Sequence, residues 1–409
     1  MKRIITGILS AVVMLSVCSC SEKKEAAKPK GQDLSKAAPV REIEGNFGRY
    51  VSNTFVATGN NHLVESAEGV TYRAYFPVEE YGELEYCFYF SNTVDSTYDD
   101  GKKAYVGLVG GEYTIESAFI ADGGTSIEDE ITDRTPVTFE SSTEKKVSGG
   151  ETYWSDPVSF NLEEGHYLVW EWTLTGSNIP ATSMSNLTKT GADYNNGKGL
   201  QYCDQIPLPQ IIGADRDVKY RVTAIGDSIT QGCQTEFMAY EYWAARIAQG
   251  LGSDYSFQNC GLGWSRTSDA AECGDWLERA SASDIVVVAF GTNDIVSGEY
   301  GGDGSNTASE IDAYLRTVLD KLRAKGCQII VFNAPPEDYL DHLEAIRVEY
   351  NEKLKATCEE YGVFLFDFAS LLSDESEPKK ALYGGHPNGE GGKIVADEFL
   401  KLYKDYLAM

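Results

Sequence analysis

The pattern of the sequence changes near residue 213, and this change constrains the fold more than any other feature. Before it, short runs rich in aromatic and β-branched residues are separated by Gly, Asn and Asp. After it, short apolar runs alternate with longer segments of helical periodicity. The first pattern predicts an all-β sandwich of jelly-roll type, and the second predicts an α/β domain whose parallel sheet is covered by helices on both faces. We therefore expect a β-sandwich domain over residues 43–213 and an α/β domain over residues 214–409.

The expected strands and helices follow from these runs. In the first domain, the strand-like runs are 71–76, 84–90, 103–109, 114–120 and 166–172. In the second domain, the strand-like runs are 218–225, 255–260, 284–290, 328–333 and 363–368, and the helical segments are 238–251, 307–325, 339–361 and 390–407. Because chemistry in an open parallel sheet gathers at the carboxyl ends of the strands, functional residues of the second domain should directly follow strands.

The start of the chain has the composition of a targeting segment. Lys2 and Arg3 precede an apolar run of 14 residues, 4–17, which is too short to span a bilayer comfortably and is typical of a signal-peptide core. Cys20 follows the small residue Ser19, an ending that resembles a bacterial lipobox. These features predict that Cys20 is lipidated.

This interpretation predicts where in the cell the protein is located. We expect a signal peptide over residues 1–19 and a flexible tether over residues 20–42, which are rich in Lys, Glu, Ala and Pro. The mature protein would then be exported to the bacterial cell envelope and held at a membrane by its N-terminal lipid anchor, facing the surface or the periplasm. The alternative is an ordinary secretory signal with incidental cysteines.

The chain is strongly acidic, with 63 Asp and Glu against 35 Lys and Arg and a formal net charge of −28. Removal of residues 1–19 would take away Lys2 and Arg3 and no acidic residue, so the net charge would become −30. A surface this negative repels nucleic acid, so we expect no nucleic-acid partner. The charge suits an exported protein acting on neutral or cationic substrates, and plain solubility also explains it.

The cysteines do not form a recognisable metal or disulfide pattern. Beyond Cys18 and Cys20, seven cysteines remain, and none belongs to a CxxC pair or to a Cys/His cluster with zinc spacing. The sequence therefore predicts no metal site, and it leaves the disulfides open.

The run 218–225 ends abruptly at Gly226, Asp227 and Ser228. A buried strand that ends in a tight turn is a common way to mount a serine nucleophile, because the strand fixes the backbone and the hydroxyl lies at the sheet edge. The alternative is a serine that only caps a helix. Other residues at the same edge must decide between the two.

Three further residues lie in segments that follow expected strands. His386 is in a Gly- and Pro-containing loop between the last strand and the last helix, Asn293 follows the run 284–290, and Gly263 follows the run 255–260. Acyl transfer by serine needs a base and donors for the developing oxyanion. We predict Ser228 as nucleophile and His386 as base. The predicted oxyanion donors are the N–H of Ser228, the N–H of Gly263 and the Asn293 side chain.

With these four blocks in this order, the second domain resembles the SGNH hydrolases, the GDSL esterase/lipase family. The resemblance implies a three-layer α/β/α domain and an ester hydrolysis that proceeds through an acyl-serine without metal or cofactor. Two positions depart from the family pattern. Tyr383 stands where the family often has the Asp of the triad, so a Ser228–His386 dyad is expected. Trp264 stands where the oxyanion glycine often lies, and of the two N–H groups, Gly263 and Trp264, we predict that of Gly263.

The β-rich domain in front and the missing Asp also make the chain similar to the carbohydrate esterase family 2 deacetylases. That resemblance implies removal of O-acetyl groups from an acetylated polysaccharide or oligosaccharide, with Trp264 lining the sugar site; core packing is the alternative role of Trp264. Aromatic residues of the sandwich could likewise bind sugar or form its core. Two other functions stay open: a lipase or thioesterase for longer acyl chains, and a glycan-binding surface lipoprotein with an inactive hydrolase domain.

Overall fold

The computed structural model describes residues 41–96, 106–183, 187–300 and 306–408. Cys20, the signal peptide over 1–19 and nearly all of the tether over 20–42 lie outside these residues. Within the described ranges, no helix combines the length and the apolar composition that a membrane span requires.

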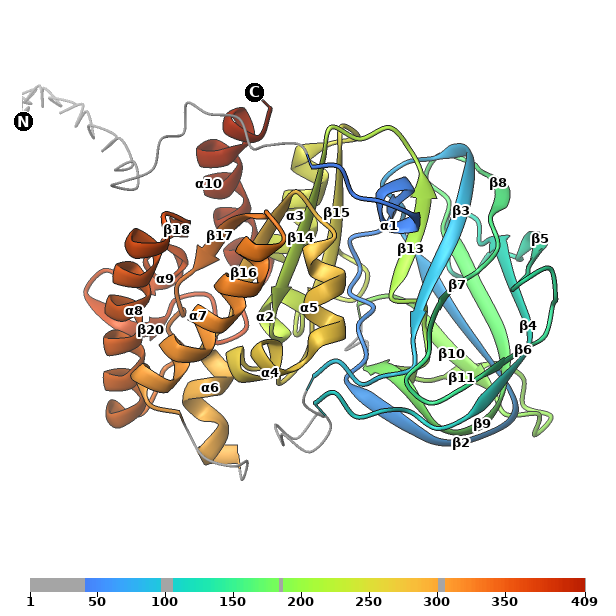
Figure 1. The fold of residues 1–409 in the computed structure, drawn as a ribbon, viewed down its shortest axis with the longest axis horizontal. Coiled ribbons are helices and arrows are strands. Elements are labelled where there is room, and N and C mark those ends of the chain that lie inside the picture. The colour runs from blue at the N-terminus through green and yellow to red at the C-terminus, as the bar shows by residue number, and fades with distance from the viewer. Residues whose placement is uncertain (1–40, 97–105, 184–186, 301–305, 409) are drawn as a thin grey trace, which may run out of the picture.

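The first half of the chain forms two antiparallel sheets that pack into a sandwich (Figure 1). The first sheet has the order β1-β13-β3-β7, with β8 also paired to β3; the strands are β1 Tyr50–Ser52, β13 Ile211–Asp215, β3 Gly82–Ser91, β7 Thr152–Trp154 and β8 Val158–Leu162. The second sheet has the order β11-β10-β2-β9-β4-β5, with β12 paired to β9 and β6 to β4; the strands are β11 Gln201–Tyr202, β10 Thr190–Asp193, β2 His62–Phe76, β9 Leu168–Ser183, β4 Tyr113–Asp122, β5 Thr132–Val137, β12 Gln205–Ile206 and β6 Lys145–Val147. A short helix, α1 Asn46–Arg49, precedes β1. The expected sandwich is confirmed.

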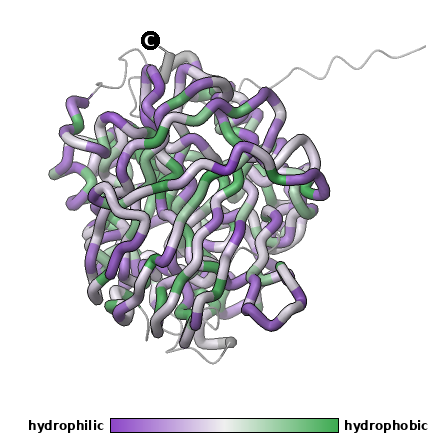
Figure 2. Tube along the Cα trace, turned by 90° about the vertical axis from the view of Figure 1, so that its right-hand side faces the viewer, coloured by the Kyte–Doolittle hydropathy of each residue, from purple (hydrophilic) through white to green (hydrophobic). Residues whose placement is uncertain are grey.

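Aromatic side chains from both sheets fill the space between them. Phe90 of β3 lies 5.7 Å from Trp170 and 5.3 Å from Trp172 of β9, measured between ring centroids, and all three are buried. Side chains alternate between the two faces of a strand, and Figure 2 shows hydrophobic and hydrophilic residues alternating along the strands of the sandwich. Phe90, Trp170 and Trp172 therefore form core.

One expected strand of this half is wrong. Residues 103–105 of the run 103–109 lie outside the described residues, and 106–109 form a turn with one isolated bridge between Thr93 and Val109.

The second half contains a parallel sheet of five strands in the order β15-β14-β16-β17-β18 (Figure 1). The strands are β14 Tyr220–Gly226, β15 Tyr255–Gly261, β16 Ile285–Ala289, β17 Gln328–Phe332 and β18 Phe364–Phe366. Every neighbouring pair is parallel. The chain moves outward from β14 in one direction to β15 and in the other to β16, so β14 and β16 flank the topological switch point, where ligands of such sheets bind.

Helices cover both faces of this sheet, as expected. Side chains of the central strand β16 point alternately to the two faces. Val287 packs with α3 and α10 on one face, and Val286 and Val288 pack with α4, α5, α7 and α8 on the other. The helices are α2 Ser228–Gln231, α3 Trp243–Leu251, α4 Thr267–Glu272, α5 Gly274–Ser281, α6 Thr292–Val296, α7 Ala308–Ala324, α8 Asp341–Tyr361, α9 Phe368–Leu372 and α10 Gly389–Ala408, with a 3₁₀ turn at Ser297–Tyr300 and a small hairpin of β19 Ser373–Asp374 and β20 Glu377–Ala381. The α/β/α class predicted from the sequence is confirmed.

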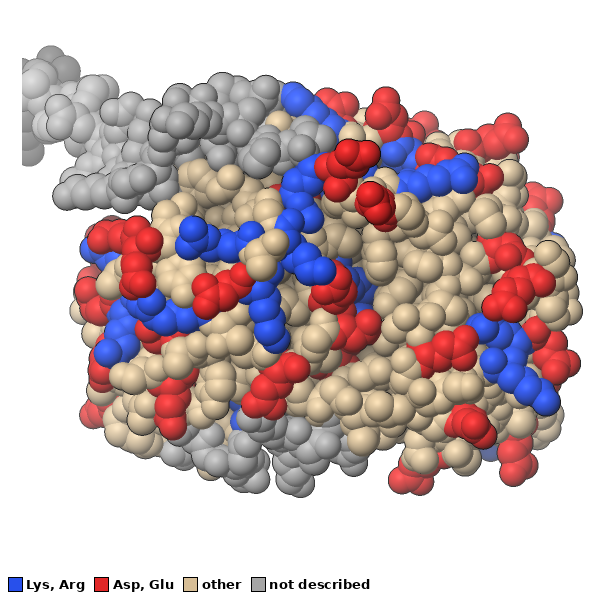
Figure 3. Space-filling view, viewed as in Figure 1, with Lys and Arg blue, Asp and Glu red and all other residues tan. Residues whose placement is uncertain are grey.

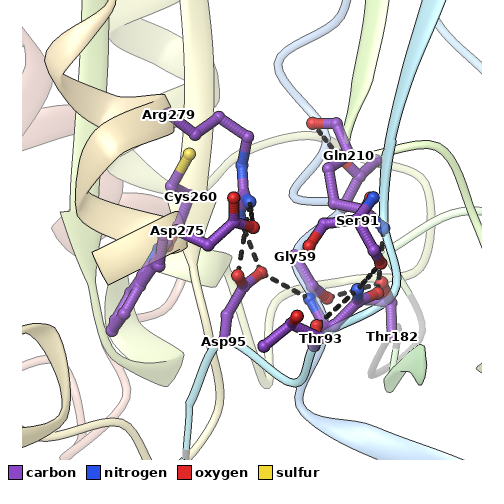
Figure 4. Close-up of polar contacts among 12 residues, drawn as sticks. Gly59, Ser91, Thr93, Asp95, Thr182, Gln210, Cys260, Asp275 and Arg279 are labelled. Carbon is purple, nitrogen blue, oxygen red and sulfur yellow. Dashed lines mark hydrogen bonds and ion pairs between the residues drawn. The ribbon is translucent and has the colours of Figure 1, made fainter. Parts of the chain in front are cut away.

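Buried polar contacts join the sandwich to the α/β half (Figure 4). Arg279 of α5 donates from Nη2 to Asp95 Oδ2 of the sandwich at 2.6 Å, and both side chains are almost completely buried. Asp95 Oδ2 also accepts the N–H of Asn60 at 2.9 Å. The exposed charges are arranged differently: on the face shown in Figure 3, basic and acidic side chains lie interspersed. The two halves are thus joined by contacts in the interior of the molecule.

Candidate active site

The turn after β14 presents Ser228 at the carboxyl edge of the sheet. Asp227 caps α2, its Oδ1 accepting the N–H of Ile229 at 2.9 Å. Gly226 permits this turn because a Cβ there would lie 2.0 Å from Thr230 Oγ1 and 2.5 Å from the Ala289 carbonyl oxygen. Ser228 is consequently the first residue of α2, and its side chain is half-buried.

The loop between β20 and α10 brings His386 to this serine. Ser228 Oγ lies 2.7 Å from His386 Nε2, a distance at which the hydroxyl donates when the imidazole carries its proton on Nδ1. Burial lowers the pKa of His386 below its ordinary value, so the ring is neutral at pH 7 and can accept a proton. The residues predicted as nucleophile and base, 158 positions apart, are therefore in contact.

No carboxylate among the described residues forms a hydrogen bond or an ion pair with the His386 imidazole, and burial alone accounts for its lowered pKa. Tyr383, at the position of the usual Asp, instead packs against the start of α10, where a Cβ on Gly391 would lie 2.8 Å from Tyr383 Cβ. This arrangement has the two members of the predicted dyad and lacks the acid of a triad.

Asn293 of α6 lies just beyond the end of β16. Its Nδ2 donates to the carbonyl oxygen of Ser265 at 3.0 Å, which fixes the plane of the amide. Ser265 belongs to the loop after β15, so this bond joins the two loops that the sequence assigned to the oxyanion site.

The prediction for Gly263 needs correction. Its N–H donates to Gln231 Oε1 at 2.9 Å in the protein interior, so in this structure it does not face the open side of the site. The next residue, Trp264, is half-buried and has φ of 67°, the left-handed region that a bulky residue seldom adopts. The N–H of Trp264 is the alternative that the sequence left open.

Comparison with known proteins agrees with this geometry. Residues 224–394 match the model of the GDSL-like lipase/acylhydrolase family. After the family model that it matches, we call this part of the chain the GDSL-like domain. The activity associated with the family is the hydrolysis of acyl esters. No curated protein matches the sequence.

Several solved structures align with part of this chain. An aryl esterase from M. smegmatis is 18% identical with a TM-score of 0.39 and covers 46% of this chain and 99% of its own. An acetylxylan esterase from Geobacillus stearothermophilus is 19% identical with a TM-score of 0.37, covering 46% and 94%. A member of the lipolytic G-D-S-L family from Veillonella parvula is 19% identical with a TM-score of 0.36, covering 45% and 97%. Likeness at this level says nothing about substrate.

Two acidic residues of the GDSL-like domain brace its loops. Asp294 Oδ2 accepts both the N–H and the hydroxyl of Thr267 at 2.9 Å, so it ties the turn after β16 to the start of α4. Burial raises the pKa of Asp294 to about 6 and that of Asp227 to about 7. Their hydrogen bonds to backbone N–H groups indicate structural roles.

Glu337, which the sequence pattern did not single out, packs beside the histidine loop of the GDSL-like domain. A Cβ on Gly385, the residue before His386, would lie 2.5 Å from Glu337 Cγ. Burial, together with the carboxylates of Asp227 and Asp338, raises the pKa of Glu337 to about 8, so it is mostly protonated at pH 7. Glu337 lies five residues after the end of β17, so the expectation that functional residues follow strands could have pointed to it.

Among the residues that the structure describes, no group of three or more His, Cys, Asp or Glu side chains could hold a metal ion. None of the seven described cysteines forms a disulfide.

Proposed function

We propose that this protein is an exported serine esterase that removes O-acyl groups, chiefly O-acetyl groups, from carbohydrates through an acyl-serine intermediate. The observation that carries the proposal is the 2.7 Å contact between Ser228 Oγ and His386 Nε2 at the edge of the sheet. A neutral histidine in hydrogen-bond contact with a serine hydroxyl is the arrangement that activates serine as a nucleophile.

In this mechanism, Ser228 Oγ attacks the ester carbonyl while His386 accepts its proton. The negative oxygen of the tetrahedral intermediate accepts hydrogen bonds from the Ser228 N–H and from the second N–H of the Asn293 amide, whose first N–H donates to Ser265. His386 then donates the proton to the departing sugar hydroxyl. A water activated by His386 hydrolyses the acyl-serine and restores the enzyme.

The preference for acetylated carbohydrate is supported by the order of the domains and by Tyr383 in place of the triad Asp, the two features shared with the carbohydrate esterase family 2 pattern. In this proposal the half-buried Trp264 lines the sugar site. Cys20 is lipidated and anchors the protein at the cell envelope; a wild-type chain that takes up no radioactive fatty acid, or a Cys20→Ala chain that still does, would contradict the anchor.

The test of the substrate is acetate release from acetylated xylan, mannan and pectin, together with a comparison of nitrophenyl acetate and octanoate. Ser228→Ala serves as the blank. Acetate release from at least one glycan and a higher kcat/KM for the acetate ester support the proposal. Faster hydrolysis of octanoate would indicate a lipase or thioesterase, and glycan binding without acetate release would indicate an inactive hydrolase domain.

The proposed base gives the reaction a defined pH dependence. Protonated His386 cannot accept the serine proton, and burial lowers its pKa, so kcat/KM should rise with an apparent pKa below 6.5 and then level off as the pH increases. The measurement is kcat/KM for nitrophenyl acetate from pH 4.5 to 8.5.

Glu337→Gln is the matched control, because Glu337 is the nearby carboxyl with a pKa of about 8. The variant should keep the acidic limb of the wild type. A limb near pH 8 that disappears in Glu337→Gln would assign the titration to the carboxyl and contradict the role of His386.

A further inference from the structure

Gln231, the last residue of α2, is fully buried although its side chain is polar. Its Nε2 donates to the carbonyl oxygen of Ser183 at 2.7 Å. Its Oε1 accepts the N–H of Gly263 at 2.9 Å and the thiol of Cys233 at 3.2 Å. One amide thus joins three segments: the helix that carries Ser228, the loop after β15 and the end of β9.

The sandwich holds its end of this bridge firmly. Ser183 is the last residue of β9, and its N–H donates to Asn61 Oδ1 at 2.9 Å. The backbone N–H of Asn61 in turn donates to the Ala181 carbonyl oxygen at 2.9 Å, and Asn61 is buried. The carbonyl that Gln231 contacts is therefore fixed by the hydrogen bonds of β9.

The other end of the bridge lies in the loop after β15, which contains Gly263, Trp264 and Ser265. We call it the oxyanion loop. Gly263 immediately precedes Trp264 and is two residues from Ser265, whose carbonyl oxygen holds the Asn293 amide. The side chain of Gln231 also packs closely here, since a Cβ on Gly263 would lie 3.3 Å from Gln231 Oε1. A shift of the Gly263 backbone would consequently move both the Trp264 N–H and the support of Asn293.

The chemistry of the bridge requires an amide. The Gly263 N–H needs an acceptor and the Ser183 carbonyl needs a donor, and a glutamine side chain supplies both without charge. A leucine of similar size would leave both backbone groups without this partner, and the bond to the Gly263 N–H is buried. A carboxylate would place a negative oxygen against the Ser183 carbonyl, whereas a protonated carboxyl could again accept from Gly263 and donate to Ser183.

We infer that Gln231 is a positioning residue through which the β-sandwich holds the oxyanion loop in register with Ser228, so that the sandwich contributes to catalysis. This inference rests on the proposed esterase function. Because oxyanion donors act mainly in the transition state, displacement of the loop should lower kcat and leave KM nearly unchanged.

The experiment measures kcat and KM for nitrophenyl acetate in Gln231→Leu. The matched control is Gln210→Leu, another buried glutamine, whose Nε2 donates to Asn60 Oδ1 at 2.9 Å and to the Leu208 carbonyl at 2.7 Å, within the sandwich. We expect kcat to fall about 10- to 100-fold in Gln231→Leu, somewhat less than for complete loss of one oxyanion donor. In Gln210→Leu, kcat per folded molecule should stay within about twofold of the wild type, because the Gln210 side chain is not part of the active site.

Gln231→Glu supplies a second reading if the leucine variant fails to fold. Its kcat relative to wild type should increase as the pH falls, because protonation restores a donor toward Ser183. A folded Gln231→Leu with wild-type kcat, or a Gln231→Glu whose relative kcat does not depend on pH, would overturn the inference while an active wild type leaves the esterase proposal intact. A wild type without esterase activity would instead overturn the proposed function.

Discussion

Replacement of Ser228 by alanine is expected to lower kcat for nitrophenyl acetate by about 10⁴- to 10⁶-fold while the protein stays folded. The loss is large because Ser228 Oγ is the attacking atom. His386 Nε2 lies 2.7 Å from Oγ, and alanine has no hydroxyl from which it could take a proton. The fold should survive, since the cap from Asp227 to the Ile229 N–H and the glycine contacts of the turn involve no atom of the serine side chain. The measurement is steady-state hydrolysis, with circular dichroism and the melting temperature as checks of folding.

Thr235→Ala is the matched control for this experiment. Thr235 also carries a hydroxyl close to the nucleophile in sequence, but its Oγ1 donates to the Gly232 carbonyl at 2.8 Å and not to the histidine. Its kcat should remain within a few-fold of the wild type, in the range of a lost local hydrogen bond. A nitrophenyl phosphonate should add one phosphonyl group to wild type at Ser228 and none to Ser228→Ala. Labelling of both proteins, or more than one per cent activity in folded Ser228→Ala, would place the nucleophile elsewhere.

The sequence was sufficient for the parts of this site that depend on local pattern. The run 218–225 ends where β14 ends, within one residue, because its β-branched residues Val222, Thr223 and Ile225 favour a strand and Gly226 and Asp227 terminate it. His386 could be selected because it is the histidine between the last strand and the last helix. Both arguments use the order of segments along the chain, which fixes the edge of the sheet at which they meet.

Side-chain direction could not be predicted in the same way. Whether the Gly263 N–H faces a substrate or Gln231 depends on how α2 packs against the loop after β15. Gln231 and Gly263 lie 32 positions apart, and the Ser183 carbonyl of the sandwich lies 48 positions from Gln231. From the sequence, Gln231 is a polar residue at the end of a short helix, and nothing in the pattern predicts that it is buried. The helices α4 and α5 were missed for a related reason, because they bury charged residues such as Asp269 and Arg279 that break the apolar periodicity.

The pair of Asp95 and Arg279 carries the second large prediction: Asp95→Ala should lower the free energy of unfolding by about 3–5 kcal/mol. The guanidinium donates from Nη2 to Oδ2 at 2.6 Å and from Nη1 to Oδ1 at 3.2 Å, and the side chains of Arg279 and Asp95 are 1% and 0% exposed. Removal of the carboxylate leaves a buried charge whose other carboxylate partner, Asp275, lies 3.3 Å away and is partly exposed (Figure 4). It also removes the acceptor of the Asn60 N–H. Urea unfolding at pH 7 measures the change.

Asp215→Ala is the matched control, since Asp215 pairs with Arg49 at 2.7 Å but the two side chains are 42% and 54% exposed. Solvent screens such a pair, so its loss should cost at most about 1 kcal/mol. Because Asp95 belongs to the sandwich and Arg279 to α5, the buried pair also couples the two halves of the molecule. Calorimetry of Asp95→Ala should therefore show the melting of the sandwich and the GDSL-like domain separating, whereas Asp215→Ala should melt as the wild type does. Equal costs in the two variants would mean that the Asp95–Arg279 pair is no more important to stability than a surface pair, and that the apolar core joins the two halves without it.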